Sequence, residues 1–128
     1  SFSKIGLAPD SGGTFFLPRL VGMARANAMV MMDEKLTAEQ AQQWGLIYKA
    51  LDDEKFQETA FAIAEKLSRM ATKALGLSKK LFNQSLFNNL QDQLEIEGEV
   101  QSLAAATSDH KEGVNAFIEK RQPNYLGE

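Results

Sequence analysis

Asp10 is the residue whose setting most suggests chemistry, because it lies in a turn that leads from an extended stretch into an apolar helix. Pro9 fixes its own φ and disfavours helix just before the turn. Gly12 and Gly13 let the backbone come close to another segment or to a ligand. A carboxylate held in such a turn could face a cleft and move a proton.

A structural role for Asp10 is the alternative. Asp and Ser are preferred helix N-cap residues, and both stand here at positions 10 and 11. The carboxylate would accept backbone N–H bonds, and its charge would suit the positive end of the helix. The residue types alone favour the cap.

Seven helices and one strand are predicted from periodicity and capping signals. Thr37 and Gln40 form a capping-box pattern, and Thr72 is expected to cap a later helix. The helices are expected at 12–20, 24–32, 38–44, 54–70, 73–88, 90–106 and 110–120, and the strand at 46–51.

Apolar side chains recur at helical spacing along 54–70, from Phe56 to Met70. Met29, Met31 and Met32 form a cluster that we interpret as core filler, with an acyl pocket as the alternative. A chain this short cannot easily cover several apolar helix faces by itself. We therefore expect it to associate with other chains.

Composition excludes several classes of function. The net charge is −3 over 128 residues, and no dense basic run suggests nucleic acid. No apolar run is long enough to span a membrane. The absence of Cys excludes disulfides and thiolate metal sites, and fits a cytoplasmic protein. A single His, His110, argues against a metal site or a Ser-His-Asp triad, so we expect no metal.

Several blocks of sequence together resemble the crotonase family, the enoyl-CoA hydratases and isomerases. The order of the blocks is specific, although no single block would be sufficient. They are Ile5-Gly6-Leu7-Ala8-Pro9-Asp10-Ser11-Gly12-Gly13-Thr14, Arg19-Leu20-Val21-Gly22, Leu36-Thr37-Ala38-Glu39-Gln40-Ala41, Trp44-Gly45-Leu46-Ile47, Ser108-Asp109-His110-Lys111-Glu112-Gly113-Val114, Ala116-Phe117-Ile118-Glu119-Lys120-Arg121 and Pro123.

The resemblance implies a mainly α chain that forms the C-terminal helical portion of a crotonase α/β fold, with at most one or two short strands. Residues 1–51 would end the crotonase core, and residues 52–128 would form a helical oligomerisation region that builds trimers or hexamers. The family's oxyanion hole and most of its CoA groove would then belong to a preceding half. We therefore expect this chain alone to be inactive.

The resemblance also assigns roles to single residues. Hydratases of the family usually carry Gly at the Asp10 position and a catalytic Glu eight residues earlier, where this chain has Phe2. An acid at the Asp10 position is typical of members that shuttle protons or attack through a carboxylate. Asp10 is therefore the predicted catalytic residue, and Gly12 and Gly13 are expected to pack closely beneath the substrate.

Phe117 and Lys120 match family positions that reach the adenine and phosphates of CoA. An aromatic surface suits the base, and a cation suits phosphate. The alternative places Phe117 in the core and Lys120 as a charge near a helix C-terminus. Glu97 and Glu112 are interpreted as salt-bridge or cap groups, and His110 as a surface residue.

An acyl-CoA isomerase is the leading hypothesis, with an acyl-CoA as substrate and no cofactor besides the CoA that the substrate carries. One carboxylate can take a proton and return it if an apolar site favours its protonated form. Ile5, Leu7, Phe15 and Phe16 could provide that site. The alternatives are a hydratase or another lyase of the family, and a helical assembly module without catalysis.

Overall fold

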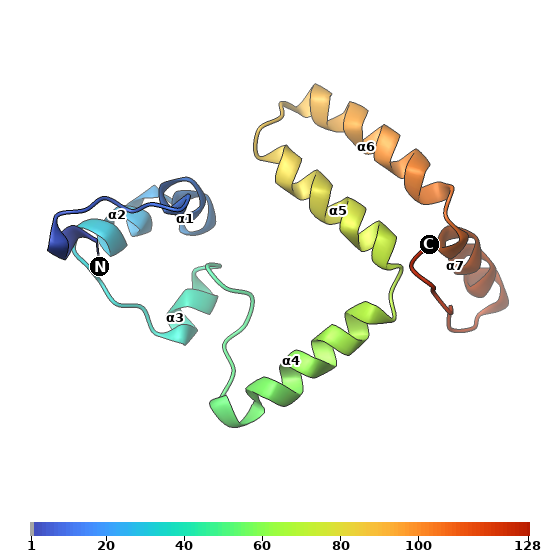
Figure 1. The fold of residues 1–128 in the computed structure, drawn as a ribbon, viewed down its shortest axis with the longest axis horizontal. Helices are drawn as coiled ribbons and strands as arrows, with labels where there is room; N and C mark the ends of the chain where they lie inside the picture. Colours follow the sequence, from blue (N-terminus) through green and yellow to red (C-terminus); the bar gives the residue numbers. More distant parts are fainter. Residues whose placement is uncertain (1) are drawn as a thin grey trace. The chain divides into compact units, whose positions relative to one another are not determined.

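Helices make up all the regular structure of the part of the chain that the computed structural model describes, residues 2–128 (Figure 1). They are η1 (Ser3–Ile5), a 3-10 turn, and α1 (Gly13–Val21), α2 (Met23–Met31), α3 (Ala38–Gln43), α4 (Asp53–Ser68), α5 (Thr72–Ser85), α6 (Leu90–Ala105) and α7 (Ser108–Glu119). The mainly α prediction is confirmed, and the α-helices begin and end within two residues of the predicted bounds, except that α5 ends three residues before the predicted residue 88.

Contacts divide the chain into two compact units, Ser1–Phe56 and Gln57–Glu128. The boundary falls inside α4, so this helix contributes its first turn to one unit and the remainder to the other. The expected division into residues 1–51 and 52–128 stays a prediction.

In the first unit, α1 packs on α2. Gly22 ends one helix and precedes the next, with φ at 82° and ψ at 157°, outside the helical region. Val21 and Ala26 on either side of it are buried. The Arg25 guanidinium lies 4.7 Å from the centre of the Trp44 ring, so a cation–π contact joins α2 to the end of α3.

The predicted capping box at the start of α3 is confirmed. Thr37 Oγ1 accepts a hydrogen bond of 3.2 Å from Gln40 N, and Gln40 Oε1 accepts one of 3.0 Å from Thr37 N. The two side chains satisfy two N–H groups that a helix start otherwise leaves without partners.

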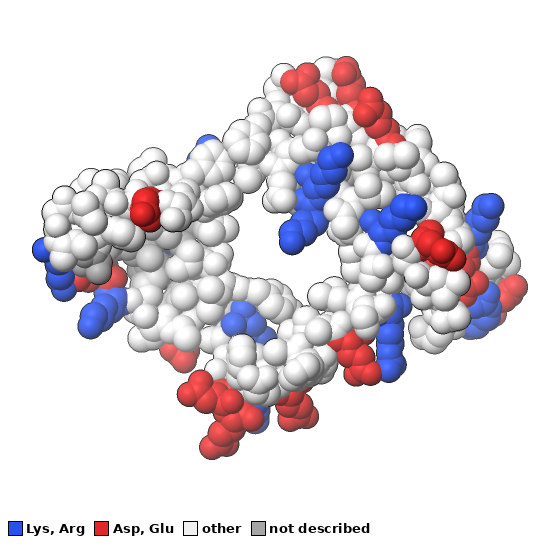
Figure 2. Space-filling model, viewed as in Figure 1, with Lys and Arg blue, Asp and Glu red and all other residues white. Residues whose placement is uncertain are grey.

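In the second unit, α5 and α6 form an antiparallel hairpin (Figure 1). Asn89 separates them and caps α6 by accepting a hydrogen bond from Asp92 N at 3.0 Å. Gln93 Nε2 donates across the hairpin to the Leu81 carbonyl at 3.4 Å. Acidic side chains gather over α6 and basic ones over α5 in Figure 2.

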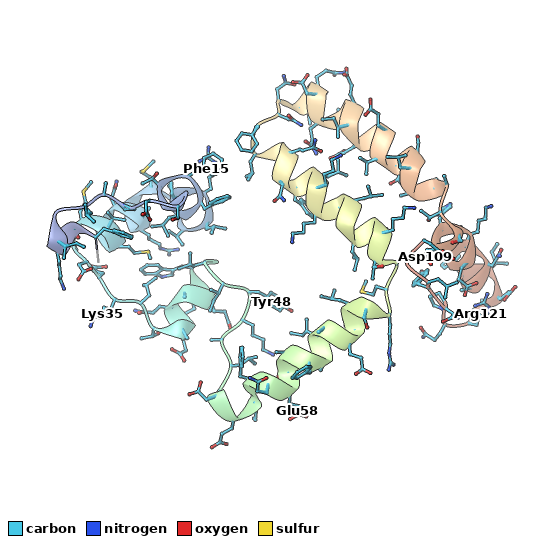
Figure 3. All side chains as sticks on the ribbon, viewed as in Figure 1. Phe15, Lys35, Tyr48, Glu58, Asp109 and Arg121 are labelled. Atoms are coloured by element: carbon cyan, nitrogen blue, oxygen red, sulfur yellow. The ribbon has the colours of Figure 1, made fainter. Side chains whose placement is uncertain are left out.

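The last residues fold back onto the start of α7, where Asp109 is only 3% exposed. Its carboxylate accepts hydrogen bonds from Leu126 N at 2.7 Å and from Gly127 N at 2.9 Å. Ser108 Oγ and Asp109 N both donate to the Glu128 carbonyl. Figure 3 shows Asp109 at the start of α7 beside this returning segment. We call residues 121–128 the docked tail.

The predicted strand at 46–51 is wrong. The segment has no regular structure, and Tyr48 is 89% exposed. Ala50 N donates to the Gln42 side chain at 2.6 Å instead of to a neighbouring strand. Alternating apolar residues form a strand only where another strand pairs with them, and residues 2–128 contain no strand.

Three smaller expectations are also wrong. Ala71, not Thr72, is the N-cap of α5, and Thr72 is its first helical residue. The extended stretch expected before the Asp10 turn begins instead with the 3-10 turn η1. Met31 and Met32 are 74% and 66% exposed, so they are not core filler in their unit.

Small side chains account for most of the buried apolar residues of the described chain, which are Val21, Ala26, Ala41, Val100 and Ala116. The larger apolar side chains of α4 remain exposed to between 38% and 71%. They are Phe56, Phe61, Ile63 and Leu67, with Met70 just after the helix. The prediction that the chain leaves several apolar helix faces uncovered is confirmed.

Candidate active site

The Asp10 side chain is exposed and does not cap α1. The N-cap is Gly12, with φ at 80°, and no side chain makes a cap hydrogen bond there. The cap interpretation of Asp10 is therefore wrong. Among the described residues, the hydrogen bond that the Asp10 carboxylate accepts comes from Ser11 Oγ, 3.2 Å from Oδ1.

Two successive left-handed residues explain why Asp10 stands clear of the helix. Ser11 has φ at 53°, and Gly12 follows with φ at 80°. Gly13 N donates to the Asp10 carbonyl at 2.8 Å and closes the turn. The backbone of Asp10 is thus held by the turn, while its carboxylate accepts no hydrogen bond from the N–H groups at the start of α1.

The two glycines of this turn are not equivalent. A Cβ on Gly12 would lie 3.2 Å from the Phe16 ring, in a backbone conformation that favours glycine in any case. A Cβ on Gly13 would make only an ordinary contact of 3.7 Å with Pro9. The backbone conformation therefore favours glycine at position 12, whereas position 13 has room for a Cβ.

An apolar hollow of about 230 Å³ adjoins the Asp10 turn, between α1 and α2. Its walls are Pro9, Gly13, Thr14, Leu17, Pro18, Met23, Ala26, Asn27, Val30 and Met31. Of the residues expected to give Asp10 an apolar site, Ile5, Leu7 and Phe16 are more than half exposed in this unit. The Phe15 ring meets Phe16 edge-on at 5.1 Å and carries the Arg19 guanidinium over its face.

Phe117 and Lys120 lie on the last turn of α7 in the second unit. The Phe117 ring is 85% exposed, so it is not part of the core of that unit. Lys120 is the C-cap of α7, with φ at 53°, and its N–H donates to the carbonyls of Ala116 and Phe117. Asp10 belongs to the other unit.

An open hollow of about 450 Å³ borders Phe117. It is lined by Ala71, Ala74, Gln101, Ala104, Thr107, Asp109, His110, Gly113, Val114, Phe117 and Tyr125. His110 is exposed in the first turn of α7, as predicted.

The enoyl-CoA hydratase/isomerase family model matches residues 1–128. The chain belongs to this family. It is 44% identical over 127 residues to 1,2-epoxyphenylacetyl-CoA isomerase of Escherichia coli, covering 99% of this chain and 48% of that enzyme. It is 39% identical over 123 residues to 2,3-dehydroadipyl-CoA hydratase of the same organism, covering 96% of this chain and 48% of that enzyme.

A crystal structure of an enoyl-CoA hydratase from Bacillus anthracis superposes with a TM-score of 0.92 at 32% identity. The match covers 98% of this chain and 49% of that one. The chain thus spans about half the length of the relatives that it matches. The helical architecture predicted for this part of an enoyl-CoA hydratase/isomerase is confirmed.

Glu112 is the second carboxylate that holds the docked tail of this family member. Its oxygens accept hydrogen bonds from the Arg121 guanidinium at 2.6 and 2.9 Å and from Asn124 N at 2.7 Å. Arg121 also donates to Glu119 at 2.6 Å. The prediction that Glu112 is a salt-bridge group is confirmed.

Asp109 and Ser11 are the two residues that the sequence did not single out. Asp109 lies in the first turn of α7, two residues after the N-cap Thr107. The signal for a further role was its spacing of three residues from Glu112, which places both carboxylates on one face of a helix. Ser11 was predicted only as a possible helix N-cap residue, and the N-cap is Gly12.

The structure offers no metal centre in residues 2–128, where no three His, Asp or Glu side chains are grouped to bind an ion. Across the same residues, none of the helices combines the length and apolar character needed to cross a membrane.

The docked tail is expected to loosen in acid because of Glu112. Hydrogen bonds from Arg121, and then from Asn124 N, lower the pKa of Glu112 from 4.5 to about 2. The folded pKa lies below the unfolded value, so the ionised carboxylate stabilises the docked tail above pH 4.5. That contribution is lost as the pH falls from 4.5 to about 2. Hydrogen exchange at the Asn124 amide, followed by NMR across this range, measures the loss.

Glu112→Gln is the control for this titration, since it keeps the shape of the side chain and removes the charge. The variant is expected to exchange faster at neutral pH and to show little further change in acid. An equal pH dependence in both proteins would assign the titration to another carboxyl group.

Proposed function

We propose that the complete polypeptide carrying this chain is an acyl-CoA isomerase in which Asp10 shuttles the proton. The observation that carries the proposal is an exposed carboxylate in the turn before α1 that is not used as a helix cap. The family membership and the 44% identity to an isomerase that acts on an acyl-CoA support the same reaction class.

The proposed reaction needs one carboxylate and no further cofactor. The ionised Asp10 carboxylate takes a proton from the α- or γ-carbon of the acyl group, and the thioester becomes an enolate. N–H donors must stabilise the enolate oxygen, and by the family resemblance these belong to the preceding half. The Asp10 carboxylic acid then returns the proton to the other carbon, which moves the double bond and restores the carboxylate.

Phe117 and Lys120 are proposed to contact the CoA part of the substrate. An exposed ring supports stacking on adenine, and a cation at the end of α7 supports a phosphate contact. Gly12 and Gly13 are proposed to let the substrate lie close to the backbone. The uncovered apolar faces of the helices support assembly of several copies, and we propose a trimer or hexamer.

The 1,2-epoxyphenylacetyl-CoA isomerase also suggests a substrate class. By resemblance to that enzyme, we propose an acyl-CoA whose acyl group carries a ring epoxide as the natural substrate. A hydratase is the second candidate, because a 2,3-dehydroadipyl-CoA hydratase is 39% identical. Phe2 stands where hydratases of the family usually carry Glu, which favours the isomerase.

The reaction is tested by incubating the complete polypeptide with a 3-enoyl-CoA in D₂O. An isomerase is expected to yield the conjugated 2-enoyl-CoA carrying deuterium and no added water, because the acid form of a solvent-exposed carboxylate exchanges its proton. Mass spectrometry of the product measures both. A product heavier by one water molecule would establish a hydratase instead. If the polypeptide forms oligomers without CoA and converts no enoyl-CoA, it would be a helical assembly module without catalysis.

A further inference from the structure

Ser11 combines two features at the Asp10 turn that its neighbours do not share. It is a residue with a Cβ held in the left-handed region, with φ at 53°, where such residues are uncommon. Its Oγ also donates to Asp10 Oδ1 at 3.2 Å. Unusual backbone conformations persist where the surrounding structure requires them, and they cluster at functional sites.

The hydrogen bond and the backbone conformation act on the same carboxylate. The backbone is left-handed at Ser11 and Gly12, and the Asp10 side chain makes no cap hydrogen bond with the N–H groups of α1. The hydroxyl then restrains that side chain, since one carboxylate oxygen is held while Oδ2 accepts no hydrogen bond from the described residues. A restrained carboxylate with one free oxygen is the arrangement that a proton shuttle needs.

We propose that Ser11 is a positioning residue for Asp10, so that its hydroxyl holds the carboxylate in the orientation that transfers the proton. The inference rests on the proposed function of Asp10 and adds a residue to it. Ser11 does not itself exchange a proton with the substrate. A residue of this kind acts on kcat and leaves the binding of the CoA part of the substrate unchanged.

The alternative is that Ser11 is only a turn residue, and two variants separate the two roles. Ser11→Gly removes the hydroxyl and suits the left-handed backbone. Ser11→Ala removes the hydroxyl and keeps the unfavourable backbone. Loss of a hydrogen bond to a charged group corresponds to a factor of about ten or more in rate. We therefore expect both variants to lower kcat about tenfold, with KM within about twofold of the parent value.

The measurement is deuterium exchange on the 3-enoyl-CoA with the complete polypeptide, with Ser3→Ala as the matched control for loss of an exposed hydroxyl. Thermal unfolding of each variant checks that it is folded. A kcat for Ser11→Gly equal to that of the parent would overturn the proposal. A kcat that falls in Ser11→Ala but not in Ser11→Gly would also overturn the proposal, because the effect would then come from the backbone conformation and not from the hydroxyl.

The double variant Asp10→Asn/Ser11→Gly separates this inference from the proposed function. If the hydroxyl acts through Asp10, the double variant is expected to be no slower than Asp10→Asn alone. If the double variant is instead slower than Asp10→Asn by the same factor that Ser11→Gly costs alone, Ser11 acts independently of Asp10. That result would overturn the inference. Full activity of Asp10→Asn would instead overturn the proposed function itself.

Discussion

Replacing Asp10 by Asn is expected to slow proton exchange at the α- or γ-carbon of an enoyl-CoA by a factor of about 10² to 10⁴, the usual contribution of a general acid–base group. Asn has nearly the same shape as Asp but cannot accept and return a proton at neutral pH. CoA binding should be retained, because Phe117 and Lys120 are proposed to carry it. Exchange is followed in D₂O with the complete polypeptide, and CoA binding by calorimetry.

The matched control is Asp52→Asn, which removes an exposed carboxylate from the loop before α4. This variant is expected to exchange at the parent rate. Unchanged exchange in Asp10→Asn would mean that a group other than Asp10 moves the proton. Loss of CoA binding along with exchange would point to a structural fault.

Replacing Asp109 by Ala is expected to lower the free energy of unfolding by about 3 kcal/mol, since hydrogen bonds to a charged group contribute about 1.5–3 kcal/mol each. Asp109 is 3% exposed, and its carboxylate accepts two backbone N–H bonds from the docked tail. Its removal leaves those two N–H groups without a partner. Urea unfolding monitored by circular dichroism measures the change.

Asp109→Asn and Glu99→Ala are the controls for this loss. The amide keeps one oxygen acceptor, so Asp109→Asn is expected to lose less stability than Asp109→Ala. Glu99 is exposed on α6, and its replacement should change the free energy of unfolding by no more than about 0.5 kcal/mol. A comparably small change for Asp109→Ala would contradict a stabilising role for the docked tail.

Local signals were sufficient to place the helices. The capping pair Thr37 and Gln40, the break at Gly22 and the cap at Asn89 all act within four residues of the helix that they bound. The strand predicted at 46–51 failed because a strand depends on a partner that no local pattern reveals. The burial of the α4 side chains could not be predicted for a similar reason. Their spacing identifies an apolar face of the helix, but it does not show what covers that face.

The geometry of the candidate site, like the strand and the burial, could not be predicted from local sequence patterns. Spacing and resemblance were enough to single out Asp10, but they could not tell that the N-cap would be Gly12. That outcome depends on left-handed backbone at Ser11, a residue type that seldom adopts it. The role of Asp109 depends on backbone groups 17 and 18 residues away, which side-chain patterns cannot indicate.

The docked tail also bears on how the chain folds. Its bonds to Asp109 and Ser108 close loops of only 17 to 20 residues. The entropy lost on closing a loop rises slowly with its length, and proteins rich in such local contacts fold fastest. We therefore expect α7 and the tail to reach their native pairing without a search over distant segments, so that Asp109 is buried early in folding.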